Sequence, residues 1–141
     1  FWRIFIGCNF HITSCFSLAG WVMVIIFEKF TTFSYGVKAF TQSDDYSGEF
    51  MTNSTMPKKY KNETIGKILL KKHTIVGAGS IIMPGVTLEE GTSVGAMSLL
   101  LKSTEPWGIY VGRPARRLRD RKKQLLLLEK EYLNNYESEV H

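Results

Sequence analysis

The stretch from Leu70 to Leu101 reads LKKHTIVGAGSIIMPGVTLEEGTSVGAMSLLL and repeats with a period of six residues. Branched aliphatic residues recur in one phase, at Leu70, Val76, Ile82, Leu88, Val94 and Leu100. Small or β-branched residues recur four positions later, at Thr74, Ser80, Val86, Thr92 and Ser98. This period differs from the roughly 3.6 residues of a helix and the 2 of a strand. It is typical of a hexapeptide β-helix, in which three short sides close one triangular coil.

The residue types agree with such a coil. The aliphatic side chains would point to the prism axis and stack about 4.8 Å apart along it, and only small residues fit at the corners. An amphipathic helix is a poor alternative, since each interior glycine would cost roughly 0.5–1 kcal/mol. A sandwich would show alternation broken by turns every 8–12 residues or so. The sequence therefore predicts an all-β fold, a parallel β-helix.

The N-terminal part, residues 1–41, carries the same repeat less regularly. Ile6, Ile12 and Leu18 are in phase, and the phase then slips by three residues between Gly20 and Ile26. It resumes with Phe27, Phe33 and Ala39. We expect this segment to form the first coils.

Residues 42–64 abandon the repeat and predict a loop that protrudes from one corner. The segment is polar and contains Gly48 and Pro57, and a long excursion from a rigid scaffold is usually functional or disordered. Several apolar side chains argue against disorder: Tyr46, Phe50, Met51, Met56 and Tyr60. Such a loop has apolar surface to bury, for which a neighbouring subunit is one candidate.

The C-terminal part divides at residue 112. Residues 65–111 carry the regular coils and an extended strand that leaves them, and residues 112–141 predict a helix and a tail. The helix is expected from about Pro114 to Asn135. Its four leucines, Leu125 to Leu128, cover more than one face, so it should pack on the prism or on another chain. Residues 1–141 thus form one domain.

Composition limits the function classes. The 141 residues carry a formal charge of +5 with a pI near 9.3. The excess is concentrated in Lys58–Lys72 and Arg113–Lys123, which suits an anionic ligand better than nucleic acid. Cys8 and Cys15 form no CxxC motif, as expected in a reducing cytosol. The apolar run Leu18–Phe27 is far shorter than the roughly 20 residues of a membrane span. A cytoplasmic protein is predicted, and the start without Met suggests that residues may precede Phe1 in the natural product.

The repeats, the corner loop and the exit sequence Gly112-Arg113-Pro114-Ala115-Arg116 together resemble the hexapeptide-repeat acyltransferases. The resemblance is to the sugar and xenobiotic O-acetyltransferases related to galactoside acetyltransferase. It is strongest over residues 65–120 and weaker over 6–41. The loop sequence from Ser43 to Gly48, SDDYSG, is similar to that of a branch that acetylates surface-polysaccharide sugars.

The resemblance implies a left-handed coil, an exception to the usual right-handed crossover, and a homotrimer with acetyl-CoA bound between subunits. By family position the residues expected to bind acetyl-CoA are Gly77, Ala78, Gly95, Ala96, Lys102, Pro114, Arg116 and Arg117. The glycines and alanines offer slim backbone beside the pantetheine, and the cations would meet the phosphates. Arg116 and Arg117 could instead form only a solvated helix start.

The expected chemistry is direct acyl transfer from acetyl-CoA to a hydroxyl of a sugar or a small hydroxylated compound. A general base takes the proton of the acceptor as it attacks the thioester, and a backbone N–H stabilises the oxyanion. In the galactoside-type enzymes the corner loop carries a histidine, whereas this loop offers Asp44 and Asp45. His11, at a corner, is the first candidate for the base, with an aspartate to orient it. A His11 that only hydrogen-bonds backbone is as compatible with the sequence.

The count of repeats separates these residues. His11 falls at the corner after the first side and Asp44 at the corner after the third, so they should meet only across a subunit interface. Asp44 and Asp45, with Tyr46, are also candidates for binding the sugar hydroxyls. No metal site is predicted, because His11, His73 and His141 are too scattered for the three-imidazole zinc of a γ-type carbonic anhydrase.

Two alternatives remain open from the sequence. The acceptor could be the amine of an amino sugar, which would make the protein an N-acetyltransferase. The chain could also be a catalytically degenerate trimeric scaffold, since the loop histidine is missing and the first coils are irregular.

Overall fold

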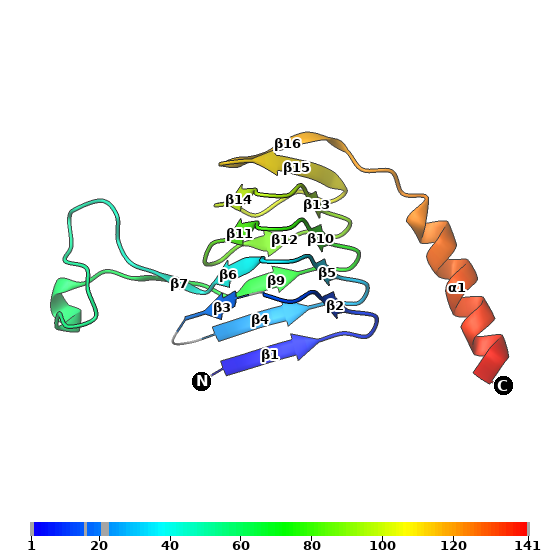
Figure 1. Cartoon of the computed structure of the whole chain (residues 1–141), viewed down its shortest axis with the longest axis horizontal. Coiled ribbons are helices and arrows are strands. Elements are labelled where there is room, and N and C mark those ends of the chain that lie inside the picture. Colours follow the sequence, from blue (N-terminus) through cyan, green and yellow to red (C-terminus); the bar gives the residue numbers. More distant parts are fainter. Residues whose placement is uncertain (1, 16, 21–22, 141) are drawn as a thin grey trace.

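The computed structural model describes residues 2–15, 17–20 and 23–140. The chain winds into a three-sided parallel β-helix, with β1 at one end and β16 at the other (Figure 1). Side 1 contains β1 (Trp2–Ile6), β4 (Met23–Phe27), β9 (Ile68–Leu70) and β12 (Thr87–Leu88). Side 2 contains β2 (His11–Ile12), β5 (Thr32–Phe33), β10 (Ile75–Val76), β13 (Ser93–Val94), β15 (Gly108–Gly112) and β16 (Ala115–Asp120). Side 3 contains β3 (Ser17–Ala19), β6 (Lys38–Phe40), β11 (Ile81–Ile82) and β14 (Leu99–Leu100).

The strand registers confirm the hexapeptide period. In the regular coils from β9 to β14, partners on all three sides are 18 residues apart: Leu70 pairs with Leu88, Val76 with Val94, and Ile82 with Leu100. One turn of the coil therefore uses three repeats. The six side chains of this phase are at most 3% exposed and form the axis of the core. The residues four positions later are buried as well: Thr74, Ser80, Val86, Thr92 and Ser98.

The three-residue slip near the N-terminus is also present in the register. Ile6 pairs with Phe27, Ile12 with Phe33, and Leu18 with Ala39, each 21 residues apart. The three extra residues fall between β3 and β4. Phe27, Phe33 and Ala39 are fully buried, whereas Ile6 is 57% exposed. Ile6 departs from the expected core because β1 is the edge strand of side 1.

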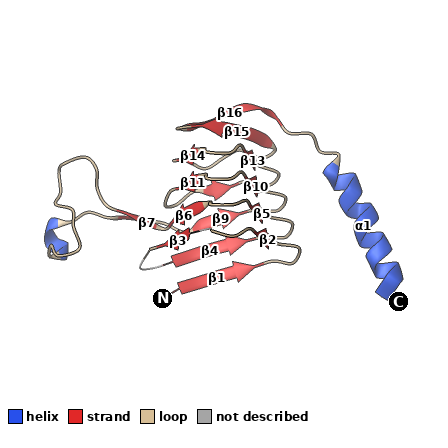
Figure 2. Ribbon diagram, in the orientation of Figure 1, coloured by secondary structure: helices blue, strands red, loops and turns tan. Residues whose placement is uncertain are grey.

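The predicted corner loop leaves and re-enters the coil through an antiparallel neck. β7 (Gln42–Ser43) pairs with β8 (Thr64–Ile65), and a short 3₁₀ helix, η1 (Lys58–Tyr60), lies farther out. Figure 2 shows helices only outside the coil, in this loop and at the C-terminal end. The loop and the C-terminal helix lie on opposite sides of the coil in Figure 1. The pairing of β7 with β8 fixes the positions of the loop residues nearest the coil.

The predicted helix start near Pro114 is wrong. Residues 108–120 form a hairpin, in which β15 adds a parallel strand to β13 and β16 returns antiparallel along β15. The expected exit strand therefore completes side 2 instead of leaving it. The Arg113–Pro114 peptide bond at the turn is cis. The free edge of β15 supplies backbone partners to residues 115–120, and this pairing outweighs their helix propensity. The helix itself, α1 (Leu125–Val140), begins later.

Candidate active site

A cleft of about 370 Å³ lies between side 3 and the base of the corner loop. Its size is within the usual range of small-molecule sites, about 300–1,000 Å³. Outward-facing apolar residues of side 3 and polar residues of the loop line it: Phe40, Ile81, Met83 and Leu99, with Gln42, Ser43, Asp44 and Tyr46. Asp44 and Tyr46, both predicted to bind the acceptor, therefore share one cleft. Asp44 is the carboxylate in this lining.

The neighbouring carboxylate, Asp45, stabilises a turn of the loop. Its Oδ2 accepts hydrogen bonds from the backbone N–H of Ser47 at 3.0 Å and from the Ser47 hydroxyl at 2.7 Å. The Ser47 hydroxyl oxygen in turn accepts from the Glu49 N–H at 3.1 Å. This is an Asx-type turn, and it assigns Asp45 to the shape of the loop. The two adjacent aspartates thus occupy different environments.

Gly77, Ala78, Gly95 and Ala96 stack at the corner between sides 2 and 3. A Cβ on Gly77 would lie 2.5 Å from the backbone nitrogen of Ala96, so the successive coils approach closely here because Gly77 has no side chain. The N–H of Gly95 donates to the carbonyl of Tyr110 at 2.8 Å, and the β15–β16 turn with Pro114 follows on the same side of the fold. Five of the residues predicted to bind acetyl-CoA therefore lie along one corner.

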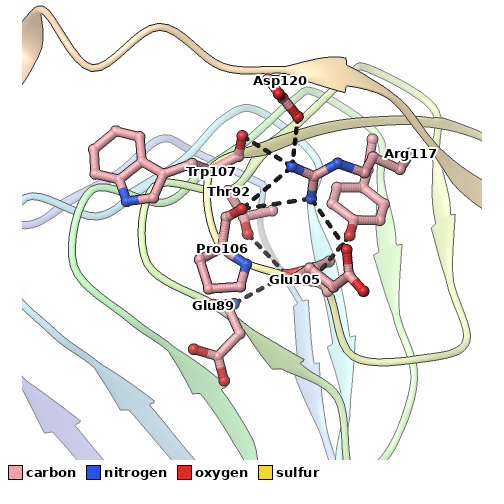
Figure 3. Close-up of polar contacts among 9 residues, drawn as sticks. Glu89, Thr92, Glu105, Pro106, Trp107, Arg117 and Asp120 are labelled. Atoms are coloured by element: carbon pink, nitrogen blue, oxygen red, sulfur yellow. Dashed lines mark hydrogen bonds and ion pairs between the residues drawn. The ribbon is translucent and has the colours of Figure 1, made fainter.

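The hairpin separates the two predicted phosphate-binding arginines. The Arg117 guanidinium contacts its own chain: Asp120 Oδ1 at 2.8 Å, the carbonyls of Pro106 and Trp107 at 3.4 Å, and Glu105 Oε2 at 3.6 Å (Figure 3). The hydrogen bond to Asp120 raises the pKa of Arg117 above its ordinary value. Arg116 is exposed, and its guanidinium donates to the carbonyl of Ala115 at 3.1 Å. Arg117 thus fastens the end of the coil, whereas Arg116 faces solvent.

Lys102 and His11 lie elsewhere. Lys102 is exposed just after β14, at the corner between sides 3 and 1 from which the loop also leaves. His11 is exposed in β2 on side 2, and its Nε2 lies 3.3 Å from the hydroxyl of Thr13. Asp44 follows β7, at the opposite end of side 3 from side 2. His11 and Asp44 are therefore on different parts of the chain, as the count of repeats predicts.

His73 has a role that sequence reasoning missed. It is 8% exposed, its ring stacks on Phe30 at 5.1 Å between centroids, and its Nε2 donates to Glu129 Oε2 at 2.7 Å. Lys72 Nζ lies 2.5 Å from the other oxygen of Glu129, and Arg121 donates to the His73 carbonyl at 2.7 Å. His73 and Lys72 thus attach α1 to the corner between sides 1 and 2. A contact between residues 56 positions apart has no local sequence signal.

Replacing Glu129 with Gln tests this attachment. Burial alone raises the pKa of Glu129, but the hydrogen bonds from Lys72 and His73 outweigh it and hold the pKa below its ordinary value. The attachment therefore stabilises the fold above the unfolded-state pKa of about 4.3 and is lost as the pH falls through the folded-state value. At pH 7 we expect Glu129→Gln to lower the free energy of unfolding by about 1–3 kcal/mol.

Urea unfolding of the wild type and the variant at pH 7 and pH 3 measures this effect, and we expect the difference between the two proteins to shrink at pH 3. Glu131→Gln, an exposed position on the same helix, is the control and should leave the stability at pH 7 unchanged. A Glu129→Gln protein as stable as the wild type at pH 7 would show that the attachment contributes nothing.

A second cleft, of about 450 Å³, lies near the β1 end of the coil. Phe5, Ile6, Gly7, Phe27, Glu28, Lys29 and Lys72 line it. It contains no residue predicted for catalysis or acyl-donor binding, and its apolar side includes the exposed edge strand β1. We therefore take the smaller cleft, which contains Asp44, as the candidate site.

Within residues 2–15, 17–20 and 23–140, no group of three or more His, Cys, Asp or Glu side chains is arranged to hold a metal ion. Within the same ranges, no helix has the length and apolar character needed to cross a membrane.

Comparison with known proteins first defines the class. No family model matches the sequence. The coil is similar to that of the hexapeptide-repeat acetyltransferase VCA0836 from Vibrio cholerae, with a TM-score of 0.59 over 85% of this chain and 72% of that chain. At 18% identity this likeness shows the fold alone.

AntD, an N-acyltransferase from Bacillus cereus solved with dTDP and 3-hydroxybutyryl-CoA, is much more similar. It is 37% identical, with a TM-score of 0.86 over 96% of this chain and 72% of that chain. The chain therefore belongs to the hexapeptide-repeat acyltransferase family that includes AntD. This confirms the predicted fold class, a left-handed parallel β-helix with one corner loop and a C-terminal helix.

A curated relative points the same way. The dTDP-4-amino-4,6-dideoxy-D-glucose acyltransferase of Escherichia coli is 36% identical over 119 residues, which are 84% of this chain and 62% of the relative. The chain thus spans less than two thirds of the length of that relative. A variant of AntD has also been solved with dTDP-4-amino-4,6-dideoxyglucose and coenzyme A, at 36% identity and a TM-score of 0.85 over 94% of this chain and 71% of that chain.

Proposed function

We propose that this protein transfers an acyl group from acyl-CoA to the amino group of a nucleotide-linked amino sugar. The observation that carries the proposal is Asp44, which lines the cleft beside the loop in a chain 37% identical to AntD. The relatives support N-acylation better than the O-acylation expected from the galactoside-type resemblance. The acceptor class follows the dTDP-amino sugar named for the relatives.

The chemistry of Asp44 suits an amine acceptor. The amine nitrogen attacks the thioester carbonyl directly, the C–N bond forms, and the C–S bond breaks to release coenzyme A as its thiolate, which then receives the proton taken from the nitrogen. Only after attack does the nitrogen become a strongly acidic ammonium, so a carboxylate within hydrogen-bond reach can take its proton. A hydroxyl acceptor needs a stronger base at the moment of attack. The Asp44 side chain is 44% exposed, so a substrate can reach it.

The acyl donor is proposed to lie between subunits, along the corner between sides 2 and 3 of a neighbouring copy, because within one chain this corner and Asp44 lie at opposite ends of side 3. The coils approach closely at Gly77, and the neighbouring Ala78, Gly95 and Ala96 are small, so this corner has no bulky side chain to exclude a narrow chain such as pantetheine. Arg116, at the end of this corner, would meet a phosphate. The proposal does not include Arg117, because Asp120 and two carbonyls already bind its guanidinium.

Substitution of the two arginines should separate these roles. Arg116→Ala removes a phosphate contact, and we expect the KM for acyl-CoA to rise about 3–10-fold, as for a single charged hydrogen bond of about 1 kcal/mol, with Tm unchanged. Arg117→Ala should lower Tm instead, because the carbonyl of Pro106 and the carboxylate of Asp120 lose the donor that ties them together. Steady-state kinetics and thermal unfolding of both variants provide the measurement. The reverse assignment of the two effects would contradict the proposed donor site.

We further propose a cytoplasmic homotrimer. Tyr35 and Met97 are 58% and 57% exposed near the corner between sides 2 and 3, and such apolar side chains favour contact with another copy. Exposed Cys8 and Cys15, both free thiols, agree with a reducing compartment. In a trimer His11 of one copy could approach the cleft of another, so it remains the second candidate for the proton acceptor.

Thermal unfolding with and without coenzyme A tests the donor site. A ligand at about 100 times its dissociation constant stabilises the folded state by roughly 2.7 kcal/mol, and we expect a clear increase in Tm. A folded protein that shows no increase would favour the alternative of a scaffold without acyltransferase activity.

A further inference from the structure

The neck of the loop contains a network of polar side chains that ends at Asp44. Lys61 lies at its centre, with its ammonium 3.4 Å from Asp44 Oδ1 and 2.5 Å from Glu63 Oε1. Gln42 Nε2 donates to the other oxygen of Glu63 at 2.9 Å. Because β7 and β8 pair in this neck, the four side chains come from its two strands and the residues next to them. The network therefore runs from one cleft-lining residue, Gln42, to another, Asp44.

Burial makes this network more than a surface ion pair. The Lys61 side chain is 11% exposed and that of Glu63 is 26% exposed, whereas Asp44 opens to the cleft at 44%. A covered ammonium has fewer alternative geometries than an exposed lysine, and its geometry is fixed further by two partners. Lys61 does not line the cleft, and it contacts Asp44 from within the neck of the loop.

The charges explain why a cation is needed there. One lysine ammonium lies between two carboxylates and offsets half of their combined charge. Without it Asp44 and Glu63 would repel each other across the neck. The hydrogen bond with Glu63 raises the pKa of Lys61 above its ordinary value, and the same bond lowers the pKa of Glu63. Lys61 therefore stays charged at neutral pH, with Glu63 as its fixed anchor.

We propose that Lys61 is a positioning residue that, anchored by Glu63 and Gln42, holds the Asp44 carboxylate toward the acceptor cleft. This inference rests on the proposed function only for the role of Asp44 as the proton acceptor. The contacts among Gln42, Glu63, Lys61 and Asp44 do not depend on that function. A lysine with an ordinary solvated role would not be covered and bound between two carboxylates.

The kinetic test compares Lys61→Met, Lys61→Arg and a control, Lys59→Met, whose exposed lysine lies over the Tyr60 ring of the same loop. We expect Lys61→Met to lower kcat about 10–100-fold, because misplacing a reacting group by about 1 Å costs on this scale. The KM for acyl-CoA should stay unchanged. Lys61→Arg should restore most of kcat, and Lys59→Met should match the wild type.

A second comparison isolates the route through Asp44. In an Asp44→Asn background Lys61→Met should cause little further loss of kcat, since the group that it positions is already gone. Fully additive losses would overturn the proposal, as would a Lys61→Met protein with wild-type kcat. Loss of activity in Lys61→Arg equal to that in Lys61→Met would overturn it too.

Crystal structures of the wild type and of Lys61→Met decide the positioning independently of activity. We expect the coil to be unchanged and the Asp44 carboxylate to turn away from the cleft in the variant. If the Asp44 carboxylate has the same position in Lys61→Met as in the wild type, the positioning role of Lys61 is refuted, whatever the activity of the variant. A wild type that acylates no acceptor would refute the proposed function, and the two structures would still decide the question of Lys61.

Discussion

Replacing Asp44 with Asn should lower kcat/KM for the amino-sugar acceptor by about 10²–10⁴-fold, the usual contribution of a group that takes a proton in the transition state. Asn keeps the size of the side chain, but it cannot accept the proton from the nitrogen after attack. The KM for acyl-CoA should change little, because the proposed donor corner does not include Asp44. Steady-state kinetics with saturating acyl-CoA provides the measurement.

The matched control is Asp45→Asn. The Asp45 carboxylate accepts two hydrogen bonds from Ser47, so this change should affect the loop turn and cause a much smaller kinetic loss. His11→Ala tests the other candidate and should keep turnover within about tenfold of the wild type. A severe loss in His11→Ala together with a mild one in Asp44→Asn would transfer the role to His11 of a neighbouring copy.

Replacing Ile82 with Ala should have the largest effect on stability. Ile82 is fully buried in the axis of the coil, between the chains of the adjacent turns. Removing most of such a side chain from a close-packed core costs about 2–5 kcal/mol, and urea unfolding followed by circular dichroism measures it. The Ile82→Ala protein should still show a cooperative unfolding transition in urea if the rest of its coil is intact.

The neighbouring residue supplies the control for this prediction. Ile81 belongs to the same strand, β11, but it faces outward into the candidate cleft. Ile81→Ala should therefore change the stability far less and act mainly on acceptor binding. If Ile82→Ala cost no more than Ile81→Ala, the axial position of the aliphatic repeat would be incorrect.

The sequence predicted the coil well because its information is local and periodic. Every sixth position from Leu70 to Leu100 is a branched aliphatic residue that points inward, and a one-residue shift of register would expose all of these side chains. The three-residue slip before Phe27 was also readable, since Phe33 and Ala39 resume the same phase. The loss of the six-residue phase after Ala39 predicted the corner loop.

The parts that sequence reasoning missed depend on contacts between distant segments. Residues 115–120 are rich in arginine and look helical, but they form a strand because the edge of β15 is available. Glu129 and His73 meet across 56 positions, and Lys61 reaches Asp44 only because β7 and β8 pair. The antiparallel neck pairs Gln42 with Ile65 and Ser43 with Thr64, which brings Lys61 and Glu63 close to Asp44, and this pairing has no local signal in the sequence.

The choice between hydroxyl and amine acceptors also lay beyond the sequence pattern. The repeats and the exit motif are common to the class, and they do not specify the atom that attacks the thioester. Two observations favour the amine: a loop that presents an aspartate without a histidine, and the similarity to AntD over most of the chain.

The most direct test of this account is an acyl-transfer assay of the purified protein with acyl-CoA and dTDP-4-amino-4,6-dideoxyglucose, with products identified by mass spectrometry. We expect release of free coenzyme A together with one acyl group added to the sugar amine. We expect no product when the amine is replaced by a hydroxyl. Acylation of the hydroxyl sugar but not of the amino sugar, or no transfer by a folded protein, would contradict it.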